Sequence, residues 1–321
     1  MRFPSVAAPA AAAFTVLVAG AAARAAGQSW IPPSPDERCP SHWGADDERG
    51  AANHMAPETV LKAARLIREG RVIELGQVLR GSMPLGARHF DLYMKPTGPN
   101  VGSNQRGSNE ELVVAEMGQV GTQFDGFAHQ TIGGSLYNCV DQNEIMTRDG
   151  FTRLGVENVG TLMTRGVLID VAALKGVEML PDTYEITVDD LQQTLNRQGV
   201  TLESGDAVLI HTGWGVLWDT NAERFMATNP GIGVAAAQWL AEQDPMLLGA
   251  DNQPVEVSPN PDPQVSLPVH QIMLVVHGIH LVERMKLYEL AAAGVYEFAF
   301  VVQPLKIQGG TGSTVAPVAI Y

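Results

Sequence analysis

The chain has 321 residues, a formal net charge of −14 and a hydrophobic content of 45%. This composition is typical of a globular protein and not of a disordered one. Because nucleic acids and anionic membranes attract basic surfaces, the acidic balance argues against both as partners. We therefore expect a soluble enzyme or a binding protein for small molecules.

Residues 1–25 have the pattern of a secretory signal peptide. Arg2 gives a positive start, residues 10–23 are a run of small and apolar residues, and residues 23–25 (A-R-A) form an A-x-A cleavage site. An uncleaved membrane anchor is less favoured, because the run is short and rich in alanine. We predict a secreted or periplasmic protein without a membrane partner after cleavage.

The two cysteines, Cys39 and Cys139, do not have the spacing of a metal or redox motif. Export would place them in an oxidising compartment, where a disulfide between them is possible. Two unpaired thiols fit the sequence equally well.

The first part of the mature chain is predicted to be an extended arm followed by a domain. Residues 26–56 are rich in proline and form the arm, and residues 57–321 form the domain. Residues 57–70 are predicted to be a helix that begins at a proline and ends at a glycine. Residues 71–79 read as a strand, and the proline- and glycine-rich residues 80–110 as loop.

The rest of the chain mixes strands and helices without regular alternation, which predicts a single mixed α/β domain. A helix over 187–198 has Thr187 as its N-cap and ends at Gly199. Residues 309–314, rich in glycine, are predicted to be a tight turn. The other expected strands cover 112–120, 166–171, 206–211, 246–249 and 298–302, and the other expected helices cover 234–243 and 267–277.

The most informative segment is residues 119–129, QVGTQFDGFAH. Gln119, Gln123, Asp125 and His129 share the same parity, so in an extended chain they project to one side. Asp125 offers an anionic oxygen, and His129 an imidazole that can bind a metal or move a proton. The spacing also fits a structural role, with Asp125 capping nearby amides and His129 hydrogen-bonded in the core.

A second informative segment follows near the C-terminus. His270 and His277 are seven residues apart and are predicted to share one face of a helix that Gly278 ends. Glu283 lies on the strand that follows. Histidine and glutamate in so apolar a segment must be paired or bound to a metal. The sequence does not place His277 or His280 relative to Asp125.

Residues 119–129 resemble the motif H-x-G-T-H-x-D-x-P-x-H of the metal-dependent cyclase-like hydrolases, which include bacterial kynurenine formamidase, isatin hydrolase and trans-dienelactone hydrolase-like enzymes. Four motif positions match: Gly121, Thr122, Asp125 and His129. Three differ, since Gln119 and Gln123 replace two histidines and Phe127 replaces the proline. Residues 41–55, 204–214, 230–233, 247–252, 269–283 and 304–320 also resemble family segments, in the same order.

The resemblance implies a mixed-sheet domain of the swivelling β/β/α type and a homo-oligomer. It implies Asp125, His270 and Glu283 as metal ligands, with Gln123 and Gln119 contributing amide oxygens. We expect one divalent ion, Mn²⁺ or Zn²⁺. An amide oxygen is a weaker ligand for zinc than an imidazole and suits harder ions, so a second ion is not expected.

The function that the resemblance implies is hydrolysis of a cyclic or aryl amide or ester, such as a formamide, lactam or lactone. His129 would be the general acid and base. The family-level candidate activity is that of an arylformamidase, which converts N-formylkynurenine to kynurenine in tryptophan catabolism. Four aromatic side chains are candidates to line the substrate pocket, with core packing as the alternative for each: Trp43, Phe124, Phe127 and Trp214.

Two other functions remain open at this point. The lost histidines fit a non-catalytic protein that binds a metal or small molecule on the same fold. A metal-free enzyme with His129 and Glu283 as acid and base is the second alternative. A hydrolase turns over its substrate, whereas the binding protein does not. Activity that is insensitive to EDTA would favour the metal-free enzyme.

Overall fold

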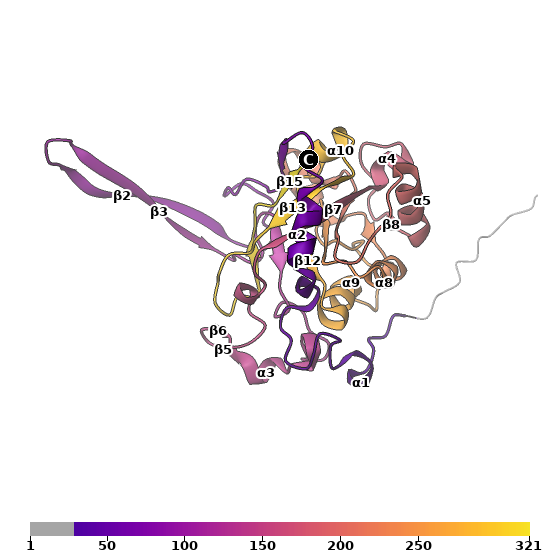
Figure 1. Ribbon diagram of the computed structural model, residues 1–321. Coiled ribbons are helices and arrows are strands. Elements are labelled where there is room, and N and C mark those ends of the chain that lie inside the picture. The colour runs from indigo at the N-terminus through magenta and orange to yellow at the C-terminus, as the bar shows by residue number, and fades with distance from the viewer. Residues whose placement is uncertain (1–28) are drawn as a thin grey trace, which may run out of the picture.

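The computed structural model describes residues 29–321, so the predicted signal peptide lies outside the described residues. The ribbon consists of a large mixed sheet with helices packed around it and a long hairpin that projects from one side (Figure 1). Within the described part of the chain, no helix is both long and apolar enough to cross a membrane.

The central sheet has nine strands in the order β1-β15-β13-β7-β9-β11-β12-β4-β14. Its middle strands β7, β9, β11 and β12 are parallel to one another, and β4 pairs antiparallel to β12. The strands are β1 (Val72–Glu74), β4 (Gln123–Asp125), β7 (Leu162–Asp170), β9 (Ala207–His211), β11 (Leu247–Ala250), β12 (His280–Glu283), β13 (Glu297–Val302), β14 (Gly312–Thr314) and β15 (Val318–Ile320). The single mixed α/β domain is confirmed.

Helices cover the sheet and bury its parallel strands on both faces, which is why these strands read as continuous apolar runs. Helix α5 has the predicted capping, with Thr187 and Asp190 exchanging hydrogen bonds and Gly199 in the left-handed conformation. The α-helices are α1 (Pro35–Arg38), α2 (Pro57–Ala64), α3 (Gln142–Ile145), α4 (Val171–Lys175), α5 (Val188–Gln198), α6 (Leu217–Thr220), α7 (Ala222–Ala227), α8 (Val234–Glu242), α9 (Pro268–His270) and α10 (Tyr288–Ala292).

Short elements complete the fold. The strands outside the central sheet form three two-stranded sheets. They are β2 (Phe90–Val101), β3 (Arg106–Ala115), β5 (Met146–Thr147), β6 (Gly150–Phe151), β8 (Glu185–Ile186) and β10 (Gly231–Ile232). The other helical turns are η1 (Gly50–His54), η2 (Tyr137–Cys139), η3 (Val156–Asn158), η4 (Trp214–Val216) and the π-helix η5 (Gln271–His277).

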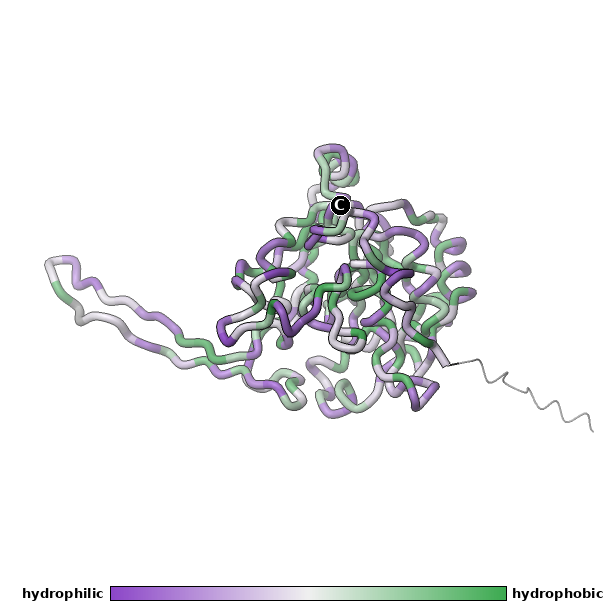
Figure 2. The backbone as a smooth tube through the Cα atoms, turned by 90° about the horizontal axis from the view of Figure 1, so that it is seen from below, coloured by the Kyte–Doolittle hydropathy of each residue, from purple (hydrophilic) through white to green (hydrophobic). Residues whose placement is uncertain are grey.

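The prediction of a loop over residues 80–110 is wrong. Strands β2 and β3 form a long antiparallel hairpin that is not part of the central sheet and projects away from the rest of the protein (Figure 2). Pro96 lies inside β2, where a two-stranded ribbon always leaves each strand one unpaired edge and so tolerates the missing amide. The preceding helix ends at Ala64 rather than near Gly70, and the strand predicted over 112–120 ends at Ala115.

Two further predictions near the C-terminus are corrected. Residues 271–277 form a π-helix, whose wider turn takes His277 away from the face that His270 occupies. His270 is buried, whereas His277 lines a separate cavity. The predicted turn over 309–314 ends in strand β14, which pairs with β4 in the register Gly312↔Asp125.

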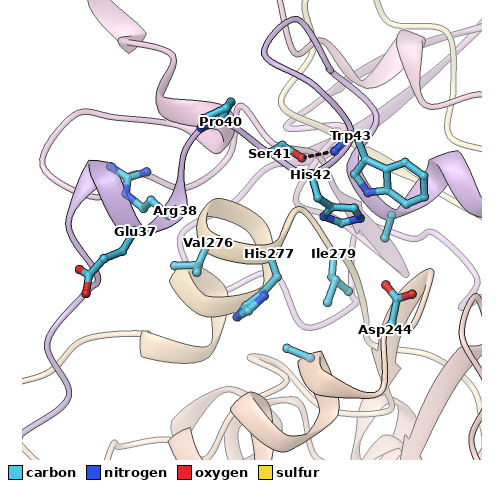
Figure 3. A pocket seen from close by; sticks show the side chains of 12 residues that line it. Glu37, Arg38, Pro40, Ser41, His42, Trp43, Asp244, Val276, His277 and Ile279 are labelled. Atoms are coloured by element: carbon cyan, nitrogen blue, oxygen red, sulfur yellow. Dashed lines mark hydrogen bonds between the residues drawn. The ribbon is translucent and has the colours of Figure 1, made fainter.

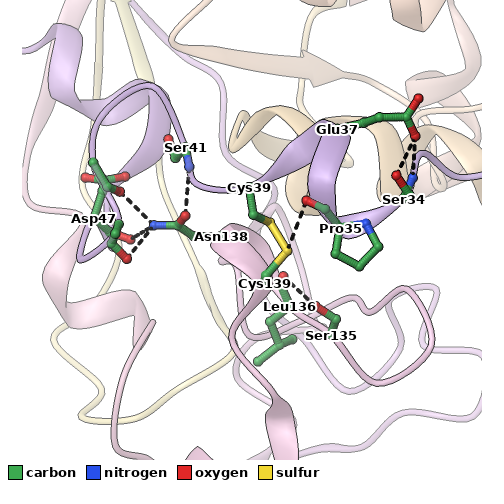
Figure 4. Close-up of a disulfide and its surroundings, with 12 residues drawn as sticks. Ser34, Pro35, Glu37, Cys39, Ser41, Asp47, Ser135, Leu136, Asn138 and Cys139 are labelled. Carbon is green, nitrogen blue, oxygen red and sulfur yellow. Dashed lines mark hydrogen bonds between the residues drawn. A yellow bond between two sulfur atoms is a disulfide. The ribbon is translucent and has the colours of Figure 1, made fainter.

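The segment 29–56 is joined to the domain by a Cys39–Cys139 disulfide, one of the two possibilities that the sequence left open (Figure 4). Beside it, the Asn138 side chain accepts a hydrogen bond from the Ser41 amide at 2.8 Å and donates to the Gly44 carbonyl at 2.9 Å. The Tyr137 hydroxyl donates to Asp47 at 2.8 Å. These contacts hold the segment against the body of the protein.

Candidate active site

The candidate site lies where β4 and β12 run side by side. Gln123 and Asp125 are two residues apart on β4, and Glu283 on β12 is opposite Gln123. Because side chains alternate along a strand, these three project from the same face of the sheet. The Gln123 Nε2 atom donates to Asp125 Oδ1 at 3.2 Å and to Glu283 Oε2 at 3.0 Å.

His270 approaches this face from the last residue of α9. Its Nδ1 is 2.7 Å from Glu256 Oε1, and Glu256 also accepts the backbone amides of Val269 and His270 at 3.1 Å each. The ring is thereby oriented with Nε2 3.2 Å from Glu283 Oε1 and 3.9 Å from Asp125 Oδ2. Glu256 therefore positions His270.

Sequence reasoning missed Glu256, which lies in a stretch that reads only as loop. A signal was present, because the glutamate is flanked by two valines. All three side chains are buried in the structure. A buried carboxylate needs a partner, so this Val-Glu-Val pattern can indicate a functional contact.

His129 completes the cluster from a turn after β4, where its amide donates to the Gly126 carbonyl at 3.1 Å. Its Nε2 lies 3.9 Å from Asp125 Oδ1, and its Nδ1 lies 3.5 Å from Gln119 Nε2. Asp125, His129 and His270 each offer one ligand atom within 4.8 Å of the other two. The His129 side chain is 19% exposed, whereas the Asp125 side chain is fully buried.

The unsatisfied atoms of the cluster fit a cation. Within the described residues, Asp125 Oδ2 and Gln123 Oε1 are buried without a hydrogen-bond partner. A buried, unpaired carboxylate oxygen is costly, and a divalent ion beside it would remove that cost. Asp125 and the two imidazoles are a donor set that Zn²⁺ and Mn²⁺ accept.

Gln123 and Gln119 contact the carboxylates through their side-chain nitrogens. The NH₂ group of Gln123 lies between the carboxylates of Asp125 and Glu283. Gln119 also directs its Nε2 toward Asp125 Oδ1, at 3.4 Å. In this arrangement the two glutamines donate hydrogen bonds to the carboxylates, and the Oε1 atom of Gln123 is left without a hydrogen-bond partner. That their amide oxygens are metal ligands stays a prediction.

Burial and charge shift the pKa values of the cluster in opposite directions. Burial raises the pKa of Asp125, and the Glu283 charge adds to this effect. Burial also opposes the charged forms of Glu283 and His270. The hydrogen bond between them outweighs burial for Glu283, and the hydrogen bonds of His270 to Glu256 and Glu283 outweigh it for His270. As a result, the pKa of Glu283 is lowered and that of His270 is raised. Of these three groups, Asp125 is the carboxylate whose charged form is disfavoured.

Arg284 stabilises the loop that carries Gln119. Its side chain is buried, and its Nη1 donates to the Gln119 carbonyl at 2.8 Å. Its own carbonyl accepts from the Thr122 hydroxyl at 2.8 Å. The residue therefore fixes both ends of the short segment between Gln119 and Thr122.

The structure places His280 and His277 outside the cluster. His280 is buried, with Nδ1 3.2 Å from the Asp125 carbonyl and its ring stacked on Phe127. Burial lowers the pKa of His280 to about 4, so the ring is neutral. His277 lines a cavity of about 300 Å³ whose lining residues are all outside the Asp125 cluster. Figure 3 shows His277 and Ile279 facing His42 and Trp43 across it.

Three of the four aromatic candidates are in the core. Phe124, Phe127 and Trp214 are at most 1% exposed and belong to hydrophobic clusters. Phe124 alternates with Gln123 and Asp125 along β4, so it points to the opposite face of the sheet. The core-packing alternative therefore describes these three, and the expectation that they line a substrate pocket is wrong. Trp43 is half-buried and lines the separate cavity.

Comparisons with known proteins agree with this fold. The family model described as "Putative cyclase" matches residues 73–257, more than half of the chain. The crystal structure of a novel cyclase aligns with a TM-score of 0.79 and 34% identity, covering 87% of this chain and 98% of that one. Isatin hydrolase A from Ralstonia solanacearum aligns with a TM-score of 0.57 and 22% identity, covering 78% of this chain and 91% of that one.

A potential metal-dependent hydrolase with cyclase activity also aligns, with a TM-score of 0.50 and 17% identity, covering 78% of this chain and 98% of that one. None of the curated proteins matches the chain. The two alignments below 25% identity show the fold alone. The family model and the 34% identical structure together show that the chain belongs to the cyclase family.

Proposed function

We propose that this protein is a metal-dependent hydrolase that opens a cyclic or aryl amide or ester. The observation that carries the proposal is the partnerless Oδ2 of buried Asp125, within reach of His129 and His270. Membership of the cyclase family supports it, as does the likeness to an isatin hydrolase and to a potential metal-dependent hydrolase.

Asp125, His270 and Glu283 would hold one divalent ion, Mn²⁺ or Zn²⁺. When bound, such an ion lowers the pKa of a water molecule and polarises the carbonyl of the substrate. The side-chain amide of Gln123 donates hydrogen bonds to both Asp125 and Glu283. It therefore occupies the place where a second cation would offset the two negative charges. This bridge supports a stoichiometry of one ion.

His129 is the group best placed to move protons. It is the partly exposed member of the three, so water and substrate can reach it, whereas Asp125 and His270 are buried. It takes the proton of the attacking water and returns it to the leaving group. Glu256 keeps the His270 ring oriented during this exchange.

The substrate class is a formamide, lactam or lactone, and arylformamidase activity is the first to assay. The proposed place of action is the periplasm or the exterior of the cell. The Cys39–Cys139 disulfide supports this place, because disulfides persist in oxidising compartments.

The proposal is tested with the purified chain loaded with Mn²⁺ or Zn²⁺ and a panel of aryl formamides, lactams and lactones. We expect turnover that EDTA abolishes and metal restores. The variant His129→Gln should keep its metal and lose turnover by about 100-fold or more, the effect of removing a general acid and base.

Other results would redirect the assignment. Metal binding without turnover of any of these substrates would favour a binding protein. Turnover that survives complete metal removal would favour acid–base catalysis without a metal. Loss of the metal in His129→Gln would make His129 a ligand instead of the proton carrier.

A further inference from the structure

The cavity that His277 lines lies apart from the Asp125 cluster (Figure 3). Its volume of about 300 Å³ is large enough for a small organic molecule. On one side it is lined by residues of the segment 29–56, and on the other by residues of α8, of η5 and of the turns that follow them. None of the proposed metal ligands lines it, so a molecule bound here does not occupy the candidate active site.

The lining of this cavity contains buried hydrogen-bond donors that have no acceptor. Within the described residues, Nε and Nη1 of Arg38 and Nε1 of Trp43 are buried without a hydrogen-bond partner. Arg38 is only 8% exposed, and the loss of water around its guanidinium lowers its pKa from the usual value. A buried, unpaired guanidinium is costly, and an anion that accepts its hydrogen bonds would remove that cost.

The two acidic side chains of the lining already have partners of their own. The Glu37 carboxylate accepts hydrogen bonds from the Ser34 amide and hydroxyl at 2.7 and 2.8 Å, and Figure 3 shows it pointing away from the cavity. The Asp244 carboxylate lies 3.0 Å from His54 Nε2 and accepts from the Ser204 hydroxyl at 2.6 Å. An occupant of the cavity therefore meets the unpaired charge of Arg38.

The rest of the lining is suited to an aromatic ring. The ring of Trp43 lies 4.5 Å from that of His42, centroid to centroid, and Val276 and Ile279 add apolar surface. Aromatic rings pack favourably against such surfaces. Since one water molecule takes up about 30 Å³ in the liquid, the cavity has room for a single ring with short substituents.

We propose that this cavity binds a small aromatic monocarboxylate. Figure 3 shows Arg38 on the Val276 side of the cavity and Trp43 on the Asp244 side. The carboxylate pairs with Arg38, the ring packs on the apolar walls, and Nε1 of Trp43 donates to a second oxygen of the ligand. The lining holds one arginine and no lysine, which matches a single negative charge better than the double charge of a phosphate ester.

Isothermal titration of the full chain with 4-hydroxybenzoate tests the proposal, in EDTA so that no metal ion contributes to carboxylate binding. Arg38→Gln removes the positive charge, and Trp43→Phe removes the N–H donor while keeping an aromatic ring. Arg71→Gln, which changes an arginine that is 68% exposed outside the cavity, is the matched control. Asp125→Asn separates this cavity from the candidate active site. Cooperative thermal unfolding of each variant shows that it is folded.

We expect the wild type, Arg71→Gln and Asp125→Asn to bind 4-hydroxybenzoate with a dissociation constant of about 1 mM or below. Binding should be at least about tenfold weaker in Arg38→Gln, the effect of losing a hydrogen bond to a charged group. Trp43→Phe should weaken 4-hydroxybenzoate about three- to tenfold and leave benzoate, which lacks the second oxygen substituent, unchanged.

Four results would overturn the proposal. The first is a wild type that does not bind 4-hydroxybenzoate, and the second is an unchanged affinity in Arg38→Gln. The third is loss of binding in Asp125→Asn, which would place the ligand at the candidate active site. The fourth is equal or tighter binding of 4-hydroxybenzamide, benzylamine or phenyl phosphate, because the cavity would then not select a single negative charge.

Discussion

Two buried histidines of this protein have closely similar surroundings and different expected roles. His270 has Glu256 at 2.7 Å from its Nδ1, and His211 has Asp170 at 2.8 Å from its Nδ1. On the Nε2 side each ring faces another carboxylate, Glu283 at 3.2 Å for His270 and Asp251 at 3.8 Å for His211. The residue types alone do not distinguish the two clusters.

The difference is in what remains unsatisfied. Asp251 accepts hydrogen bonds from the amides of Thr212, Gly213 and Gly215 and from the Thr212 hydroxyl, at 2.7 to 3.3 Å. Among the described residues, the atom left without a partner there is a histidine nitrogen, His211 Nε2, whereas at the other cluster two oxygens are left, Asp125 Oδ2 and Gln123 Oε1.

A carboxylate oxygen without a partner accommodates a cation, whereas both oxygens of Asp251 already accept hydrogen bonds. The Asp170–His211–Asp251 cluster is therefore complete as a structural element that joins the ends of β7, β9 and β11. The Asp125 cluster is complete only with an additional positive group. The following changes test this contrast, from the largest expected effect to the smallest.

The largest expected effect is loss of activity in Asp125→Asn. Residues that only orient metal ligands cost 10- to 100-fold when changed, so a proposed ligand should cost about 1,000-fold or more in kcat/KM. The matched change Asp251→Asn should leave kcat/KM within about tenfold of the wild type. Equal losses in the two variants would contradict the distinction between the clusters.

The free energy of unfolding should show the reverse order, with a larger loss for a change at Asp251 than for one at Asp125. Asp251→Ala leaves three buried amides and a hydroxyl without an acceptor, and we expect a loss of about 3 kcal/mol or more in the free energy of unfolding. Asp125→Ala removes a buried carboxylate whose Oδ2 has no hydrogen-bond partner, so the metal-free protein should lose less than about 1 kcal/mol or gain stability. Urea denaturation of both variants in EDTA measures this difference. A larger loss for Asp125→Ala would refute the contrast.

Glu256→Gln should weaken metal binding without removing it. The amide oxygen replaces only one of the two carboxylate oxygens that accept from the Val269 and His270 amides, and the charge that makes His270 a better donor is lost. Changes to residues that orient a metal ligand reduce metal affinity about 10- to 100-fold. Isothermal titration with Mn²⁺ provides the measurement, and Asp170→Asn is the matched control, which should leave the affinity unchanged. An unchanged affinity in Glu256→Gln would contradict the role of Glu256 in positioning His270.

The smallest effect concerns the pH dependence of stability at His211. Burial opposes its charge, but the hydrogen bond to Asp170 and the charge of Asp251 outweigh it and raise its pKa above 6.5. The stability that the charged form of His211 contributes is fully present below about pH 6.5. It is lost as the pH rises through the raised pKa of His211. The opposite holds for Asp170, whose pKa is lowered from 3.8 by the His211 hydrogen bond despite burial.

The stabilisation by this pair should therefore be greatest between about pH 4 and 6.5. Unfolding of the wild type and of His211→Gln in urea should differ most in that range and converge at alkaline pH. A difference that grows toward pH 9 would contradict the assigned direction of the pKa shift.

Much of the fold was predictable because local and tertiary preferences agree. Strands such as β7 and β9 are buried on both faces, so their apolar runs identify them. Helix α5 has its cap residues at both ends. The β2–β3 hairpin was missed because it has no core-facing side in the single chain and contains proline and glycine, which are also the marks of a loop.

The sequence predicted the site only where its residues lie close together along the chain. Gln123 and Asp125 share a face because of strand alternation, and their spacing was visible in the sequence. Glu256 was not, because its contact with His270 crosses an irregular loop. The distinction between Asp125 and Asp251 was also hidden, since it depends on which backbone amides reach each carboxylate.

The most direct test of this account is the number of Mn²⁺ ions bound per chain. Equilibrium dialysis followed by plasma mass spectrometry measures it for the wild type, Asp125→Asn and Asp251→Asn. The account predicts about one ion per chain in the wild type and in Asp251→Asn, and none in Asp125→Asn. A wild type that binds no ion, or an Asp125→Asn variant that binds as much as the wild type, would contradict it.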